Sequence, residues 1–120
     1  MSAQRVIAGV SDLFFSSKIS ATAKQVGARV EFVNSPQALL EKAASETALV
    51  ILDLGQASLD PVSLIGKLKA NPASAAVAVV GFVNHERTDL IEGARQAGCD
   101  QVLTRGAFST SLPELLRRAQ

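Results

Sequence analysis

The sequence lacks most of the residue types that mark metal, disulfide and nucleotide-binding proteins. It contains one cysteine, Cys99, which excludes an internal disulfide and a zinc site built on cysteines. The low cysteine count makes a reducing cytoplasm the expected location. Tryptophan and tyrosine are absent, and His85 is the single histidine. A lone histidine without a second histidine or cysteine nearby is weak evidence for a metal site.

Nucleotide-binding and hydrolase signatures are missing as well. The chain has neither a GxxxxGKS phosphate loop nor a GxGxxG turn after its first apolar run, so the usual mononucleotide and dinucleotide sites are not indicated. The GxSxG turn of serine hydrolases is also absent. A flavin crevice usually uses stacking aromatic residues, and this sequence has neither tryptophan nor tyrosine for that purpose. We therefore expect no enzymatic activity on an external substrate.

Charge and apolar runs exclude two further classes. Twelve basic and eleven acidic residues leave a net charge of +1, which provides no electrostatic footprint for nucleic acid or an anionic membrane. No apolar run approaches the roughly 18 residues that a membrane-spanning helix needs, and the N-terminus "MSAQRVIAGVSD" lacks the features of a secretory signal. The sequence predicts a single cytoplasmic domain over residues 1–120.

Five short apolar runs alternate with helix-like segments. The runs cover residues 5–10, 29–33, 48–54, 76–83 and 101–104. The first, third and fourth are almost continuously apolar, which is typical of strands buried on both faces of a parallel sheet. In the second run Glu31 separates Val30 and Phe32, and this alternation favours an edge strand.

Capping and stop signals define five helices between and after these runs. Ser11 or Asp12 can cap the first helix, and Gly27 can end it. Ser35-Pro36 and Asp60-Pro61 each predict an N-cap followed by proline at the first helical position. A fourth helix is predicted through Leu90 to Gly98, and the capping-box spacing of "SLPE" at 111–114 predicts the start of the last helix.

Five strands alternating with five helices predict a (βα)5 unit. Right-handed crossovers favour a doubly wound, flavodoxin-like sheet with helices on both faces and the strand order 2-1-3-4-5. In such a sheet a ligand site lies at the carboxyl ends of strands 1, 3 and 4. Asp53 lies at this edge, because it falls at the end of the most apolar run.

With this order of elements and "VILDLG" at the end of the third run, the chain resembles the receiver domains of two-component response regulators, of the CheY-like type. The resemblance covers essentially all 120 residues. It implies that Asp53 matches the phosphoacceptor and that acidic residues after the first strand help to hold Mg2+. It also implies a serine or threonine after the fourth strand and a lysine after the fifth, both contacting the phosphoryl oxygens.

The sequence departs from this pattern at several positions. The expected acidic pair falls on Val10-Ser11 or, one step later, on Ser11-Asp12, and only Asp12 supplies a carboxylate, so the implied Mg2+ ligands are Asp12 and Asp53. Val83 occupies the position of the hydroxyl residue, and Arg105 that of the lysine. Arginine keeps the charge, but its planar fork differs from a compact ammonium. The chain is therefore identified as a degenerate member of the family.

Each candidate residue also has a purely structural interpretation. Asp53 is either a retained acceptor or ligand, or it caps the turn after its strand. Asp12 is either a metal ligand or the N-cap of the first helix. For Arg105 we expect a phosphoryl contact or an ion pair with Asp53 that replaces the metal. Asn84 and His85 form either a polar lip of the crevice or a loop in which Asn84 caps the fourth helix. We expect Cys99 to be a core residue.

Three functions remain open. The first is a receiver-like signalling domain with a degenerate site, which acts through contact with a partner such as a histidine kinase or an effector. The second is a working Mg2+-dependent phosphoacceptor that uses Asp53, Asp12 and Arg105. The third is a small-molecule binding domain that uses the same crevice, formed by Ser11, Val83, Asn84 and His85, with Asn84 and His85 as contacts. We expect no nucleic-acid or membrane partner.

Overall fold

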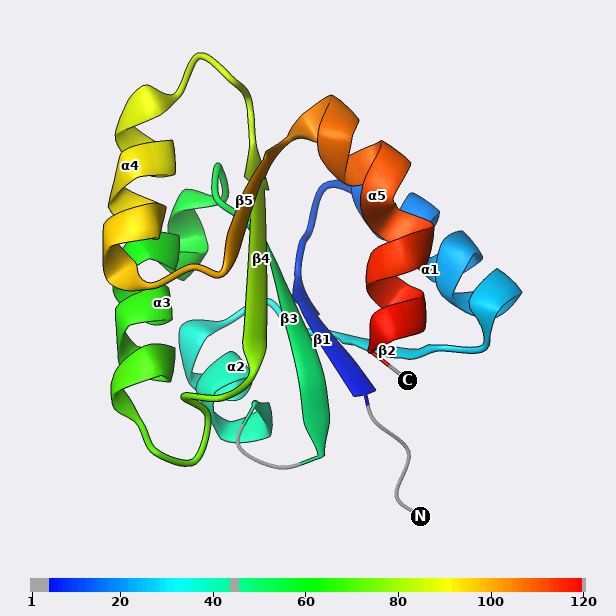
Figure 1. Cartoon of the computed structure of the whole chain (residues 1–120), viewed down its shortest axis with the longest axis horizontal. Coiled ribbons are helices and arrows are strands. Elements are labelled where there is room, and N and C mark those ends of the chain that lie inside the picture. Colours follow the sequence, from blue (N-terminus) through cyan, green and yellow to red (C-terminus); the bar gives the residue numbers. More distant parts are fainter. Residues whose placement is uncertain (1–4, 44–45, 120) are drawn as a thin grey trace.

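Five parallel strands form the centre of the molecule, in the order β2-β1-β3-β4-β5 (Figure 1). The computed structural model describes residues 5–43 and 46–119. The strands are β1 (Arg5–Gly9), β2 (Arg29–Phe32), β3 (Thr47–Asp53), β4 (Ala78–Val83) and β5 (Gln101–Thr104). Every neighbouring pair is parallel. The predicted fold class and strand order are confirmed.

Helices cover both faces of this sheet. They are α1 (Leu13–Val26), α2 (Pro36–Lys42), α3 (Pro61–Ala70), α4 (Thr88–Ala97) and α5 (Arg105–Arg118), with a short 3-10 helix, η1 (Ala57–Leu59). In Figure 1 α1 and α5 lie on one side of the sheet, and α2, α3 and α4 lie on the other. Two apolar clusters fill these layers, one against α1 and α5 and one against the remaining helices.

The central strands contribute to both clusters. Leu49 and Ile51 of β3 belong to the cluster beneath α1 and α5, whereas Val50 and Leu52 belong to the opposite one. Successive side chains of a strand point to opposite faces. A strand covered on both faces therefore has no polar positions, which explains why its run in the sequence is continuous.

Most of the predicted helix boundaries are confirmed. The Asp12 carboxylate accepts the N–H of Phe15 at 3.0 Å, which caps α1, and Ser35 caps α2 in the same way. Gly27 and Gly98 follow α1 and α4 in the left-handed region, with φ of 76° and 107°. Asp60 precedes α3 as predicted, but its side chain makes no capping hydrogen bond.

The predicted start of the last helix is wrong. α5 begins at Arg105 rather than at "SLPE", and the Thr104 hydroxyl oxygen accepts the N–H of Ala107 at 3.2 Å as its cap. Phe108 and Leu112, four residues apart, are both fully buried against the sheet. Their burial extends the helix through the polar residues before Pro113, which lies inside it.

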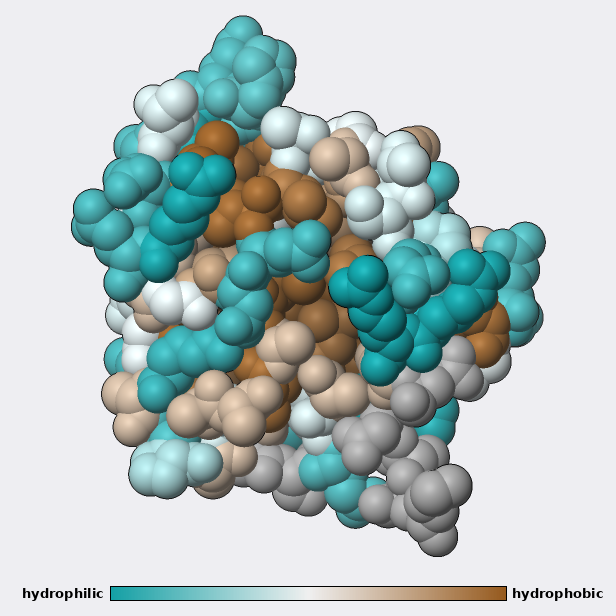
Figure 2. Space-filling model, viewed as in Figure 1, coloured by the Kyte–Doolittle hydropathy of each residue, from teal (hydrophilic) through white to brown (hydrophobic). Residues whose placement is uncertain are grey.

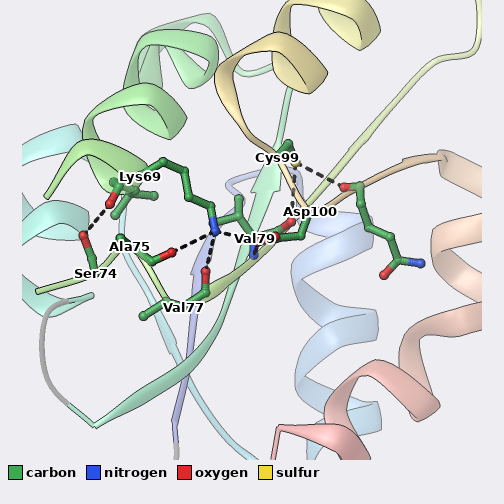
Figure 3. Close-up of polar contacts among 9 residues, drawn as sticks. Lys69, Ser74, Ala75, Val77, Val79, Cys99 and Asp100 are labelled. Carbon is green, nitrogen blue, oxygen red and sulfur yellow. Dashed lines mark hydrogen bonds and ion pairs between the residues drawn. The ribbon is translucent and has the colours of Figure 1, made fainter. Parts of the chain in front are cut away.

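A polar network ties together the loops at the amino edge of the sheet. The Lys69 ammonium donates to the carbonyl oxygens of Ala75 and Val77, at 3.3 and 2.9 Å, and to Asp100 Oδ2 at 2.8 Å. Asp100 Oδ2 also accepts the N–H of Val79 at 2.7 Å. Figure 3 shows the lysine reaching from α3 across the 71–77 loop toward the turn that precedes β5. One side chain thus joins three segments.

Cys99 lies beside this network. Its Sγ approaches the carbonyl oxygens of Val79 and Gln101, at 3.5 and 3.2 Å, and burial raises the pKa of the thiol (Figure 3). The side chain packs against the apolar cluster beneath α3 and α4, but it is only half-buried. The prediction of a core residue is therefore confirmed in its packing and not in its degree of burial.

Apolar residues remain visible between α4 and α5, where β4 and β5 run (Figure 2). The two middle residues of β5, Val102 and Leu103, are half-buried, whereas its two end residues are exposed. β2, at the opposite edge, has the same burial pattern. None of the described helices combines the length and apolar character that crossing a membrane requires.

Candidate functional site

Asp53 ends β3 at the carboxyl edge of the sheet, between β1 and β4. Its side chain is buried, with 7% exposed. Oδ1 accepts the N–H of Gly55 at 2.9 Å, and the main-chain oxygen accepts the N–H of Gln56 at 3.1 Å. These bonds close a turn after the strand, as the structural interpretation of Asp53 predicts. The acid therefore stabilises this turn and also lies where ligands bind in this class of sheet.

The environment of Asp53 disfavours its charged form. Burial raises the pKa of this carboxyl, and the nearby Asp12 carboxylate raises it further. The N–H of Gly55 and the positive charge of Arg105 act in the opposite direction, but burial has the largest effect. Desolvation disfavours a carboxylate because the buried charge loses its interactions with water.

Arg105 pairs with Asp12 rather than with Asp53. Nη2 of Arg105 lies 3.5 Å from Asp12 Oδ2, and the guanidinium carbon lies 4.6 Å from the centre of the Phe15 ring. Within the described residues, no ion pair joins Arg105 to Asp53. The predicted Asp53–Arg105 ion pair is therefore wrong. Asp53 turns back to Gly55, whereas Asp12 projects from the start of α1 toward α5.

Three phenylalanines pack against one another next to this pair. Phe15 lies 4.8 Å from Phe82, and Phe82 stacks on Phe108 at 4.3 Å between ring centres. Phe82 is also the register partner of Asp53 across β3 and β4. All three rings are buried. The sequence analysis missed this stack, although Phe82 directly precedes the edge residue Val83 and Phe108 follows Arg105 by three positions.

Ser11 makes a main-chain contact near Asp53, and Val83 has no hydroxyl. The N–H of Ser11 donates to Oε1 of Gln56 at 2.9 Å, which joins the β1–α1 loop to the turn after β3. Sequence reasoning did not identify Gln56. Val83 is buried, and it belongs to the apolar cluster beneath α2, α3 and α4. Its methyl groups therefore pack in the core of the opposite face.

Asn84 and His85 line a shallow cavity of about 300 Å3 with Thr104, Arg105 and Gly106. The Asn84 side-chain oxygen accepts the N–H of Glu86 at 2.9 Å and so closes a turn. The prediction that Asn84 caps the fourth helix is wrong, because α4 begins only at Thr88. His85 is exposed. The cavity adjoins Arg105 on the side away from β1.

Asp12 and Asp53 would be the ligands of Mg2+ at this edge, and each already holds a neighbouring group. Asp12 uses one oxygen on the N–H of Phe15 and directs the other to Arg105, and Asp53 has one oxygen on Gly55. Within residues 5–43 and 46–119, no group of three or more metal-ligating side chains gathers. Mg2+ requires hard oxygen ligands in a near-octahedral arrangement, whereas here a guanidinium already faces the available carboxylate.

Comparison with known proteins identifies the fold. No protein-family model matches the chain, and no curated protein matches it either. A response regulator from Hahella chejuensis has a TM-score of 0.82 at 16% identity, covering 95% of this chain and 92% of that one. The receiver domain of a sensor histidine kinase from Pseudomonas aeruginosa, with magnesium coordinated in its active-site cleft, has a TM-score of 0.81 at 18% identity, covering 98% of both chains. The chemotaxis response regulator CheY4 of Vibrio cholerae has a TM-score of 0.80 at 14% identity, covering 99% of this chain and 100% of that one. This chain therefore has the CheY-like receiver fold.

Proposed function

We propose that the chain is a receiver-like signalling domain of the two-component type, with a degenerate phosphoacceptor site. It acts through contact with a protein partner, such as a histidine kinase or an effector, and not through a phosphoryl group on Asp53. The receiver fold over nearly the whole chain supports the signalling class. The residues around Asp53 support the degenerate site.

The pairing of Arg105 with Asp12 is the observation that carries this proposal. A carboxylate attacks phosphorus usefully only when cations neutralise the charge that gathers around the transferring group. Here the available cation and the second carboxylate neutralise each other. The remaining nucleophile, Asp53, is buried and has a raised pKa, which also disfavours the attacking form.

Coupling to a conformational change has little support as well. A phosphoryl group shifts the population of two states only if it interacts differently with each. Val83 supplies no hydroxyl, and it packs within the apolar cluster of the opposite face. The buried rings of Phe15, Phe82 and Phe108 also pack against one another beside the site. We therefore propose a fixed recognition surface in place of a switch, and no catalytic role.

Incubation with acetyl phosphate and Mg2+, followed by intact-mass measurement, tests the proposal. We expect no phosphoryl adduct on the wild-type chain. The matched variant combines Val83→Thr with Arg105→Lys, which restores the hydroxyl and the lysine that the family pattern implies. An adduct on this variant that disappears with Asp53→Ala would support the account. An Asp53-dependent adduct on the wild type would overturn it and favour the Mg2+-dependent switch.

A further inference from the structure

Two elements carry the large exposed apolar side chains. In the described part of the chain these are Leu13, Phe14 and Phe32, with 80%, 67% and 38% exposed. They lie on α1 and β2. A groove of about 820 Å3 runs between these two elements, with Ser20, Ala21 and Lys24 on the helix side and Val30 and Phe32 on the strand side.

The groove adjoins the open edge of the sheet. β2 is the terminal strand, and its inner edge pairs with β1. The N–H of Val33 donates inward to the carbonyl oxygen of Ala8. Because main-chain groups alternate along a strand, the N–H groups of Val30 and Phe32 point outward. Each outward donor therefore belongs to a residue whose side chain lines the groove.

The other face of β2 is rich in positive charge. Glu31 is its single acid, and Arg5 of β1 and Lys42 of α2 both form ion pairs with it. These cations and Arg29 lower the pKa of Glu31. Arg29 is exposed and has no ion-pair partner within the described residues. Helix α1 adds Lys18 and Lys24 and contains no acid, so cations outnumber acids along this edge.

We propose that the outer edge of β2 binds an extended segment of a partner protein, in which apolar and acidic residues alternate, as an added strand. Its main chain pairs with the outward groups of Val30 and Phe32. Its apolar side chains enter the groove beside α1, and its acidic side chains face Arg29 and Lys42. This is the β-augmentation mode, in which main-chain bonds give affinity and side-chain pockets give specificity.

The charge of the edge argues against two other occupants. A second copy of the chain would bring two basic edges together, because each carries Arg5, Arg29 and Lys42 around one glutamate. A helix lying in the groove would leave the outward N–H groups of Val30 and Phe32 without partners. The proposal does not depend on the state of Asp53, since β2 is not part of that site.

The test uses the full chain, isotope-labelled, and two synthetic peptides. In the first peptide valine and glutamate alternate, and in the second the same residues are arranged in two blocks. We expect the alternating peptide to shift the amide signals of Val30 and Phe32 and those of the groove residues. The β5 edge is the internal control, because its strand carries no charged residue, and the signals of Val102 and Leu103 should not move.

Matched variants test the apolar face and the basic face of β2 separately. Phe32→Ser and Arg29→Glu should each weaken binding about tenfold, a loss of about 1.4 kcal/mol. Their controls are Phe14→Ser, which removes an exposed ring away from the strand, and Arg95→Glu, which reverses an exposed charge on α4. Neither control should change the affinity. Circular dichroism melts report whether each variant folds.

Four results would overturn the proposal. The first is the absence of shifts at millimolar peptide, and the second is equal binding of the block peptide, which would indicate charge attraction alone. The third is a set of shifts on α1 that leaves Val30 and Phe32 unchanged, as a helical ligand would produce. The fourth is a dimer in sedimentation that Phe32→Ser dissociates, because the occupant would then be a second copy.

Discussion

The two ends of the sheet each carry a cation and a carboxylate, but the two pairs are used differently. At the amino edge Lys69 has three hydrogen-bond acceptors, and Asp100 also holds the N–H of Val79. At the carboxyl edge Arg105 and Asp12 make one contact of 3.5 Å, and both side chains are partly exposed, at 43% and 35%. The first pair fixes loops, whereas the second lies at the edge where this class of sheet binds ligands.

This difference explains what each pair contributes. Main-chain groups at the amino edge depend on Lys69 and Asp100, whose side chains are 20% and 49% exposed, so loss of either leaves partly buried main-chain groups without partners. Few main-chain groups at the carboxyl edge depend on Arg105, and exposed ion pairs contribute little to stability. The amino edge therefore serves stability. At the carboxyl edge, the Arg105–Asp12 pair alters the charge near Asp53 and contributes little to stability.

Removal of the lysine at the amino edge should have the largest effect on stability. Lys69→Met keeps the aliphatic stem that packs near Gly98, but it leaves two carbonyl oxygens and Asp100 without their donor. We expect a loss of about 2 kcal/mol in the free energy of unfolding. Urea denaturation measures it, with Lys67→Met on the exposed side of α3 as the control. An equal loss in the two variants would show that the network is not the cause.

Neutralisation of the buried acid should have a smaller effect that depends on pH. The pKa of Asp53 is raised in the folded chain, so the folded state holds its proton to higher pH than the unfolded state. Stability due to this group is therefore present at low pH and is lost as the pH rises through the folded-state pKa.

The variant Asp53→Asn should remove this loss, because its side-chain oxygen can still accept the N–H of Gly55. Urea denaturation should be measured between pH 3 and pH 7, roughly the range in which a perturbed carboxyl titrates. The free energy of unfolding of the variant should increase relative to that of the wild type as the pH rises. A wild-type chain that gains on the variant over this range would contradict the raised pKa.

Removal of Arg105 should change stability least and the pKa of Asp53 more visibly. Arg105→Gln breaks an exposed ion pair, for which we expect about 0.5 kcal/mol. Because the charge of Arg105 lowers the pKa of Asp53, that pKa should rise in the variant. Carboxyl carbon NMR across a pH titration measures it, with Arg87→Gln near α4 as the control. An unchanged Asp53 pKa would show that the charge of Arg105 does not act on this carboxyl.

The fold could be predicted from the sequence because burial on both faces leaves an unmistakable pattern. The run that contains Leu49 to Leu52 is apolar throughout, since each side chain enters one of two cores. The start of α5 could not be predicted from local signals. The capping-box spacing of Ser111 and Glu114 indicates a helix start, whereas the burial of Phe108 and Leu112 against the sheet extends the helix to Arg105.

The sequence predicted where the site residues lie, but it did not predict which of them pair. Asp12, Asp53 and Arg105 were expected at one edge, and strand order alone brings them there. The partner of Arg105 depends on side-chain geometry across three elements, which spacing does not encode. Asp53 turns to Gly55, whereas the guanidinium of Arg105 lies over the ring of Phe15 and pairs with Asp12. The phenylalanine stack was missed for the same reason, since its members come from α1, β4 and α5.

The most direct test of the degenerate site is a backbone amide NMR titration of the wild-type chain with beryllofluoride and Mg2+, which together mimic a bound phosphoryl group. Asp53→Ala is the matched control. The account predicts no localised shifts up to several millimolar Mg2+, because Arg105 and Asp12 already neutralise each other. Shifts around Asp53, Asp12 and Arg105 that spread to α4, and that are absent in Asp53→Ala, would contradict it and show a working phosphoacceptor.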